Sequence, residues 1–197
     1  MNLNQRLELK RCPHCYIANP NIKKVHEFST SNANKTFQRT WITYVCQSCG
    51  GAIIGSRTSS SSSALELFPR LKAVDESIPE KAKEFLSQSL ETIHAPAGSI
   101  MLSATSIDAM LKEKGYKDGS LYKRIKQAAK EHLITEGMSE WANQIRLEEN
   151  DQRHADENAA LPTEEDAKRI IDFAFALGEF LYVLPNRVEN AIEKTKE

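Results

Sequence analysis

The sequence contains no run of the roughly 18 apolar residues that a membrane-spanning helix needs. Its first eleven residues are mostly polar and lack the apolar core of a signal peptide. Internal repeats, a glycine-rich phosphate-binding loop and the GxSxG motif of α/β-hydrolases are absent as well. We therefore expect a cytoplasmic protein without a membrane partner, and nothing in these motifs points to a nucleotide or ester hydrolase.

The net charge divides the chain into two parts. Residues 1–63 contain eight basic and two acidic residues, a net charge of +6, whereas the remainder has a net charge of −7. The change coincides with a serine-rich stretch that lacks apolar residues and cannot offset the entropy of ordering it. The sequence therefore predicts a domain at 1–55, a flexible linker at 56–69 and a second domain at 70–197. A basic first domain is suited to a polyanionic partner.

All four cysteines lie in the first part, in the pairs CPHC (12–15) and CQSC (46–49). Each CxxC pair can fold into a tight knuckle with both thiolates directed to one point, and four thiolates are the soft ligands that tetrahedral zinc prefers. With every position filled, the site is structural, so we expect one structural Zn²⁺ per chain. Redox disulfides or unpaired thiols are the alternatives, and His14 or His26 could compete as ligands. The predicted ligands are Cys12, Cys15, Cys46 and Cys49.

Short β-prone runs lie on both sides of the second cysteine pair, at 36–46 and 51–54. A region this small needs a metal or disulfides to hold it together. With its two knuckles, this segment resembles a zinc ribbon, and ribbons bind nucleic acid, bind protein or cap a neighbouring domain. Alternatively, Trp41 and Tyr44 form the core and the lysines are only solvated. The candidate nucleic-acid-binding residues, which suit phosphate contact and base stacking, are Lys23, Lys24, Lys35, Arg39, Trp41 and Tyr44.

Helical periodicity continues from the linker to the end of the chain. Thr163 and Asp166 form a capping pair for a long apolar helix that we expect to end before Pro185. The sequence therefore predicts a mainly α fold, with a small β zinc ribbon followed by a helical bundle. The expected helices span about 78–94, 98–114, 120–133, 139–151, 163–184 and 187–194.

Residues 78–185 resemble the prokaryotic family called domain of unknown function 4145, through the order and spacing of several short motifs. These motifs are Ile78-Pro79-Glu80, the small-residue helix 103–111, Leu121 to Ile125, Ile145-Arg146 with Asn150 and His154, and the tail 166–185. The family looks related to the HEPN helical superfamily, whose members often dimerise and include many metal-independent ribonucleases. The resemblance implies a HEPN-like bundle, a homodimer formed through it, and a role in prokaryotic defence or mobile elements.

Arg146, Asn150 and His154 are the residues that match the HEPN nuclease motif. The resemblance implies that His154 transfers protons, that Arg146 and Asn150 hold phosphate, and that Asp108 supports them. However, the spacing between Arg146 and His154 exceeds that of the nuclease motif, and acidic neighbours would repel RNA. The alternative is that these side chains link helices by hydrogen bonds, with Asp108 as a buried partner.

Three functions follow from these observations. We expect a non-catalytic or weakly catalytic accessory protein whose ribbon contacts nucleic acid or a protein partner in a restriction, anti-phage or mobile-element setting. The enzymatic alternative is a toxin-like, metal-independent endoribonuclease with its cleft between two subunits. The third is a homodimeric scaffold, in which the bundle dimerises and the ribbon docks another protein.

Overall fold

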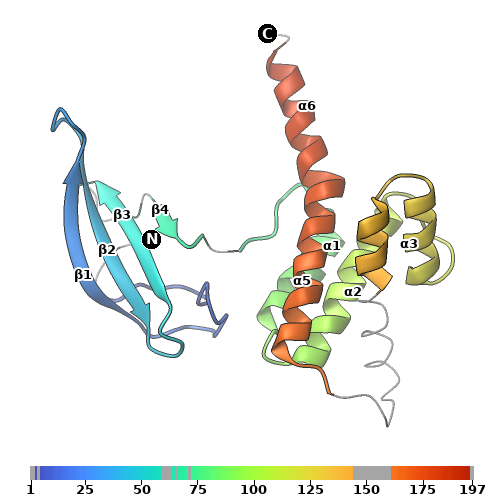
Figure 1. Cartoon of the computed structure of the whole chain (residues 1–197), viewed down its shortest axis with the longest axis horizontal. Helices are drawn as coiled ribbons and strands as arrows, with labels where there is room; N and C mark the ends of the chain where they lie inside the picture. The colour runs from blue at the N-terminus through green and yellow to red at the C-terminus, as the bar shows by residue number, and fades with distance from the viewer. Residues whose placement is uncertain are drawn as a thin grey trace. The chain divides into compact units, whose positions relative to one another are not determined.

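The computed structural model describes residues 3, 5–58, 64, 66–70, 72–143 and 161–195. The chain forms two compact units, Met1–Lys72 and Ala73–Glu197, which we call the sheet unit and the helical unit (Figure 1). None of the described helices is long and apolar enough to cross a membrane.

The sheet unit is built on four antiparallel strands in the order β1-β2-β3-β4. The expected strands near 36–46 and 51–54 are confirmed by β2 and β3, but β1 was not predicted. Its backbone pairs with β2 along its length, although only Ile22 of its side chains is buried. An edge strand of this kind leaves little apolar periodicity in the sequence. The strands are β1 (Ile22–Ser31), β2 (Gln38–Cys46), β3 (Ala52–Thr58) and β4 (Glu66–Phe68).

The linker expected at 56–69 is wrong at both of its ends. Residues 56–58 complete β3, where Ser56 is fully buried between Trp41 of β2 and Glu66 of β4 in the strand register. Backbone pairing explains why these residues form a strand. The hydrogen bonds between strands are made by backbone groups, so a segment without apolar side chains can still form them. The boundary between the units lies after residue 72, and residues 59–63 are outside the described residues.

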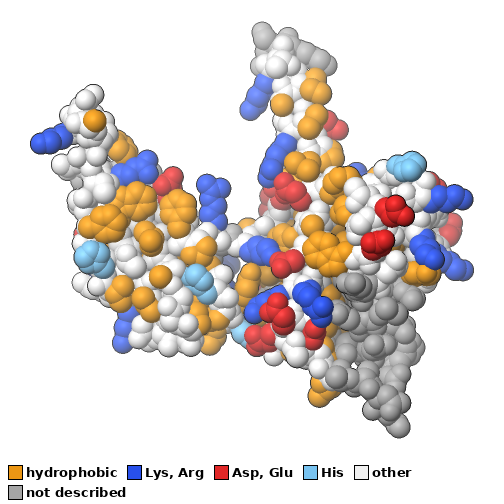
Figure 2. Space-filling view, viewed as in Figure 1, with side chains coloured by type: hydrophobic (Ala, Val, Ile, Leu, Met, Phe, Trp, Pro, Cys, Tyr) orange, Lys and Arg blue, Asp and Glu red, His pale blue; other side chains and the backbone are white. Residues whose placement is uncertain are grey.

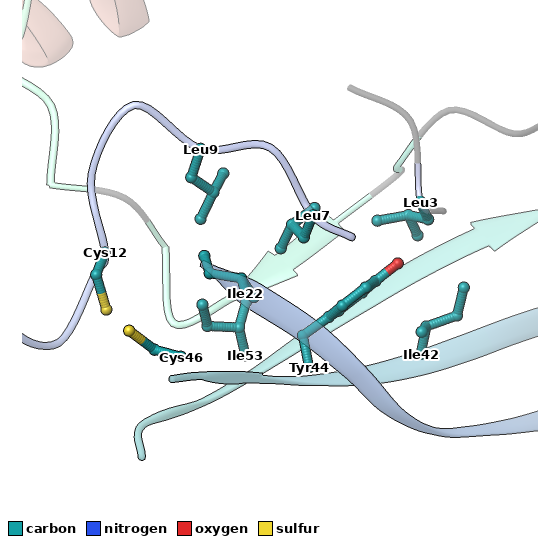
Figure 3. Close-up of a cluster of buried hydrophobic side chains, with 9 residues drawn as sticks. All are labelled: Leu3, Leu7, Leu9, Cys12, Ile22, Ile42, Tyr44, Cys46 and Ile53. Carbon is teal, nitrogen blue, oxygen red and sulfur yellow. The ribbon is translucent and has the colours of Figure 1, made fainter. Parts of the chain in front are cut away.

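One face of the sheet carries the core of this unit (Figure 3). Alternate residues of β2 point into it, and the N-terminal segment before β1 covers it with leucines. That segment is held by backbone bonds from Leu7 N to Ile22 O (3.3 Å) and from Lys24 N to Gln5 O (3.2 Å). The buried cluster comprises Leu3, Leu7, Leu9, Cys12, Ile22, Ile42, Tyr44, Cys46 and Ile53.

In the helical unit, α2 packs against both α1 and α5. The first three expected helices begin and end within three residues of α1, α2 and α3, and the predicted capping box of Thr163 and Asp166 is confirmed. The helix expected at 139–151 is described only to residue 143, as part of a helical segment at 136–143. The elements are α1 (Glu80–Glu91), α2 (Pro96–Glu113), α3 (Leu121–Lys130), α5 (Glu164–Gly178), the π-helical η1 (Glu179–Val183) and α6 (Leu184–Lys194).

Small residues set the close packing of these helices. The hydroxyl of Ser99 donates to Ser89 O (2.8 Å) and that of Ser106 donates to Ala82 O (2.7 Å), so α2 is hydrogen-bonded to α1 at two points. At Gly178, a Cβ atom would lie 2.7 Å from Ile78 Cδ1, which is closer than real Cβ atoms approach. Glycine therefore allows α5 to pack directly on this isoleucine.

The prediction that the long helix ends before Pro185 is wrong. The helix continues through η1 into α6, with Pro185 in the first turn of α6. Proline cannot donate the i→i−4 bond, and its ring clashes with the carbonyl four residues back. The Leu184 N–H donates to Glu179 O, five residues back, so a π-helical turn precedes the proline and the helix continues past it.

Candidate metal centre and aromatic face

The four cysteines converge, as predicted. All are free, and their Sγ atoms lie within 4.8 Å of one another. The Sγ atoms of Cys12 and Cys49, from different pairs, are 3.9 Å apart. Four thiolates bound to one zinc ion at about 2.3 Å would lie about 3.8 Å apart. The cluster can therefore hold a metal ion with little movement of its ligands.

The two CxxC knuckles share one backbone design. Cys12 N donates to Ile17 O (3.1 Å) and Cys46 N donates to Gly51 O (3.0 Å). The residue after each second cysteine has a positive φ, 58° at Tyr16 and 72° at Gly50, and its N–H donates to the carbonyl of the first cysteine. Glycine adopts this conformation without strain, whereas tyrosine does so at a cost. The first knuckle is therefore the more strained of the two.

The histidine of the first knuckle joins the two knuckles and is not placed as a ligand. His14 Nε2 lies 2.7 Å from Ala52 O, and since a carbonyl only accepts, this nitrogen carries the proton. The ring lies over Gly51, where a Cβ atom would be 2.4 Å from His14 Cδ2. Only glycine leaves room for this contact. His26, the other alternative ligand, lies on β1, where its ring stacks on Phe28.

The thiols differ in their readiness to ionise. Burial raises the pKa of Cys12 and raises the pKa of Cys15 to about 12. Burial acts in the same direction on Cys46, but the backbone N–H groups of Cys49 and Ser48 stabilise its thiolate and lower its pKa to about 7. Metal binding requires thiolates, so a metal ion would have to displace the protons of Cys12 and Cys15, whose pKa values are raised.

The opposite face of the sheet, which we call the outer face, carries a row of rings, of which His26 and Phe28 are exposed and Trp41 is half-buried. His26 stacks on Phe28 with ring centroids 5.8 Å apart, and Phe28 stacks on Trp41 at 6.5 Å. The indole N–H of Trp41 donates to Thr30 Oγ1 (2.8 Å), which fixes the ring across β1 and β2. Figure 2 shows hydrophobic side chains gathered on the sheet unit.

A cation lies against one end of this row. The guanidinium of Arg39 is 5.3 Å from the ring centre of Phe37 and 6.0 Å from that of Trp41. It also forms a partly exposed ion pair with Glu66 of β4 at 3.1 Å. The outer face therefore combines flat π surfaces with a guanidinium. Sequence reasoning missed Phe28 and Phe37 and considered His26 only as an alternative metal ligand, although His26, Phe28 and Thr30 alternate as one face of a strand.

The structure separates the residues that the sequence grouped as nucleic-acid-binding candidates. Arg39 and Trp41 lie together on the outer face, and Lys23 is exposed opposite Val45 of β2. By contrast, Lys24 lies opposite the core residue Tyr44 and pairs with Glu27. Lys35 occupies the turn between β1 and β2.

Tyr44 is not an exposed candidate at all. Its side chain is fully buried, and burial raises its pKa to about 12. For this residue the alternative interpretation, a core position, is correct. Trp41 is only half-buried and lies on the other face. Position along β2 therefore decides the role of each aromatic ring, because successive side chains of a strand point to opposite faces.

The proposed ribonuclease residues Arg146, Asn150 and His154 lie outside the described residues, so this assignment stays a prediction. Asp108, their expected support, is placed on α2. Its carboxylate pairs with Arg124 of α3 and with Lys112 (2.6 Å). Arg124 is 8% exposed and also donates to Lys117 O (3.1 Å), so this ion pair ties α3 to α2.

Comparison with known proteins gives one match. The family model described as Domain of unknown function (DUF4145) matches residues 88–195, which is more than half of the chain. The matched region lies within the helical unit and contains none of the four cysteines. Among curated proteins and among solved structures, none matches.

Proposed function

The chain belongs to the DUF4145 family, and we propose that its sheet unit is a zinc ribbon that binds single-stranded nucleic acid on the outer face. The observation that carries this proposal is the row of stacked rings formed by the exposed His26 and Phe28 and the half-buried Trp41. Nucleic-acid binding by the sheet unit would serve the helical unit, which contains the region matched by the domain of unknown function.

Zinc is the metal that the donor set favours. Four thiolates suit zinc in tetrahedral geometry and leave no open position for a substrate. We therefore assign the ion a structural role: it would join the two knuckles and so fix the ends of β1 and β2. Cys12 and Cys46 are fully buried beside the leucine core, which links the metal to the folding of the sheet.

Base stacking is the contact that the outer face is suited to make. Phe28 is 44% exposed and lies opposite Trp41 in the strand register. Bases stack on such rings whatever their sequence, because every base has a π face. In a duplex the bases are stacked on each other, so the proposed ligand is single-stranded.

Electrostatics supports the same ligand. Residues 1–63 carry a net charge of +6, which attracts a phosphate backbone. Arg39 lies beside the rings, where its guanidinium can contact a phosphate next to a stacked base. Its ion pair with Glu66 is exposed, and exposed pairs are worth little, so a phosphate can compete for the arginine.

Fluorescence of Trp41 tests the proposal directly. Because the chain has two tryptophans, we would use a Trp141→Phe background and titrate it with single-stranded and duplex oligonucleotides at two salt concentrations. We expect quenching by single strands that weakens at higher salt. Phe28→Ala should weaken binding by about tenfold or more, since a stacked base contributes about 1–3 kcal/mol.

Val25→Ala is the matched control. Val25 is 57% exposed on the same strand, at the irregularity between Lys24 and His26, and belongs to no ring contact. It should bind as the parent does, and both variants should keep their metal. Equal affinities of the two variants, tighter binding to duplex, or a fluorescence that no oligonucleotide changes would each refute the proposal.

For the helical unit we propose a HEPN-like bundle that acts as an accessory in a cytoplasmic prokaryotic defence or mobile-element setting. The support is the family membership together with the residues that resemble HEPN proteins. Within the described residues, Asp108 is engaged by Arg124 and Lys112, which favours a structural role for this carboxylate.

A further inference from the structure

The last helix, α6, carries an exposed apolar stripe. Phe180 of η1 and Leu184, Val188 and Ile192 of α6 recur every four residues, and each is between 40% and 57% exposed. Residues four apart lie one above the other on a helix, so these side chains form a single row. We call this row the α6 stripe. Large apolar side chains in a row on a helix indicate packing against a partner.

Nothing among the described elements covers the α6 stripe. Among the described helices and strands, α6 contacts only η1, from which it continues, and none of the residues of α6 is buried. Figure 1 shows α6 extending α5 past the other helices of the helical unit. A projecting helix of 11 residues has little stability of its own in water, because isolated helices of this length are marginal. Packing of the α6 stripe against a partner would supply the stability that the isolated helix lacks.

Charges of opposite sign flank the α6 stripe. With about 100° of rotation per residue, Arg187 and Lys194 lie on one side of Val188, and Glu189 and Glu193 lie on the other. All four are exposed. In Figure 2, hydrophobic side chains run along this helix with basic side chains at one edge. The stripe therefore has a basic flank and an acidic flank.

We propose that the α6 stripe binds the α6 stripe of a second copy of this chain, with the two helices parallel. When two identical helices pair in parallel about a twofold axis, opposite flanks of the two copies become neighbours, as e and g positions do in a parallel coiled coil. The basic flank of each copy then faces the acidic flank of the other. An antiparallel pair would place like flanks together and repel.

This pairing goes beyond nucleic-acid binding, since it uses neither the metal nor the outer face. From Phe180 to Ile192 the stripe is about 18 Å long, so the interface is at the small end for a specific complex. We therefore expect a dimer that dissociates in the micromolar range. Two sheet units in one dimer would also give two outer faces to one nucleic-acid strand.

Sedimentation of the full-length protein, from about 1 to 100 μM, tests the pairing. Val188→Asp places a charge in the middle of the stripe and should raise the dissociation constant by at least about tenfold. Asn190→Asp adds the same charge on the opposite side of α6 and should leave it unchanged. Far-UV circular dichroism and metal content should match the parent in both variants. A monomer at every concentration, or equal dimers of the two variants, would overturn the proposal.

Charge reversal decides the orientation of the two helices. In a parallel pair, Glu189→Lys sets two basic flanks against each other and should weaken the dimer by about three- to tenfold. Adding Lys194→Glu to it restores opposite charges and should recover the affinity, and it leaves the ion pair between Arg187 and Glu179 (2.9 Å) in place. In an antiparallel pair Glu189→Lys alone would relieve repulsion between acidic flanks. A dimer strengthened by Glu189→Lys would therefore overturn the parallel arrangement.

Discussion

In the helical unit, α1, α2 and α5 bury large apolar side chains between them, whereas the sheet unit has only one covered face. Its cover is a segment without regular secondary structure, and two of the nine residues in its core cluster, Cys12 and Cys46, belong to the candidate metal centre. Removing a metal ion should thus affect the two units very differently. A small sheet with one buried face depends on a cross-link, and a helical core does not.

The same contrast separates the surfaces of the two units. The sheet unit exposes rings on the face opposite its core, while the helical unit exposes an aliphatic row at its C-terminal end. Rings beside a guanidinium suit a nucleic acid, and an aliphatic row with charged flanks suits another helix. The two proposed partners would therefore use different surfaces, which can be altered independently.

Removal of the metal should have the largest effect, because it should unfold the sheet unit and leave the helical unit folded. Cys46→Ser removes a buried ligand, so the proposed zinc should be lost and the sheet unit should unfold, because binding energy at such sites is folding energy. Hydrogen exchange on the full-length protein, read by mass spectrometry, should show lost protection in β2 and unchanged protection in α2. Ser48→Ala, a change at an exposed residue of the same knuckle, should keep both the metal and the protection of β2. Protection of β2 in a protein without metal would contradict the structural role.

The cysteine spacing was readable because it encodes a local geometry. Two CxxC knuckles each form within a few residues, so their convergence needs only a short sheet between them, and the cluster of four Sγ atoms is confirmed. The capping box of Thr163 and Asp166 was equally local and is confirmed. Features determined by three or four neighbouring residues can therefore be predicted from the sequence alone.

Features that depend on distant pairing were not predictable in the same way. The row of His26, Phe28 and Trp41 exists only because β1 pairs with β2 in one register, and β1 has little apolar periodicity. Likewise, β4 follows a serine-rich stretch and is positioned by β3. The helix continues past Pro185 because a π-helical turn precedes the proline, and no sequence pattern predicts this turn. Each of these follows from tertiary context.

A change in the helical core tests the other side of the comparison. Gly178→Val should destabilise the helical unit by about 1–3 kcal/mol, because its Cβ would meet Ile78 and its methyl groups would overpack the core near Met110. Thermal unfolding followed by circular dichroism at 222 nm measures this loss, and metal content should stay at the parent value. Gly98→Val, at a helical glycine with open space around it, should be nearly neutral. Loss of metal from the Gly178 variant would show that the units are not independent.

The smallest expected effect lies at the start of α5. Thr163 donates to the Asp166 carboxylate from its backbone N–H and from its hydroxyl, both at 2.7 Å, and Arg169 pairs with the same carboxylate. These contacts, with the Thr163 N–H foremost, hold the pKa of Asp166 below its usual value. Asp166→Ala should therefore cost about 1 kcal/mol at neutral pH. The full-length protein in urea, followed by helical signal, would measure it.

Acid should erase this difference in a defined direction. Because the folded pKa of Asp166 is depressed, the stabilisation is complete above the unfolded value of about 3.9 and is lost as the pH falls through the folded value. The stabilities of the parent and of Asp166→Ala should thus begin to converge as the pH falls below about 4, and they should become equal only below the folded pKa of Asp166. Glu165→Ala alters an exposed neighbour in the same helical turn, whose carboxylate lies 4.0 Å from the ammonium of Lys168, and should cost much less. A gap between parent and Asp166→Ala that persists in acid would mean that the capping carboxylate contributes through packing and not through its charge.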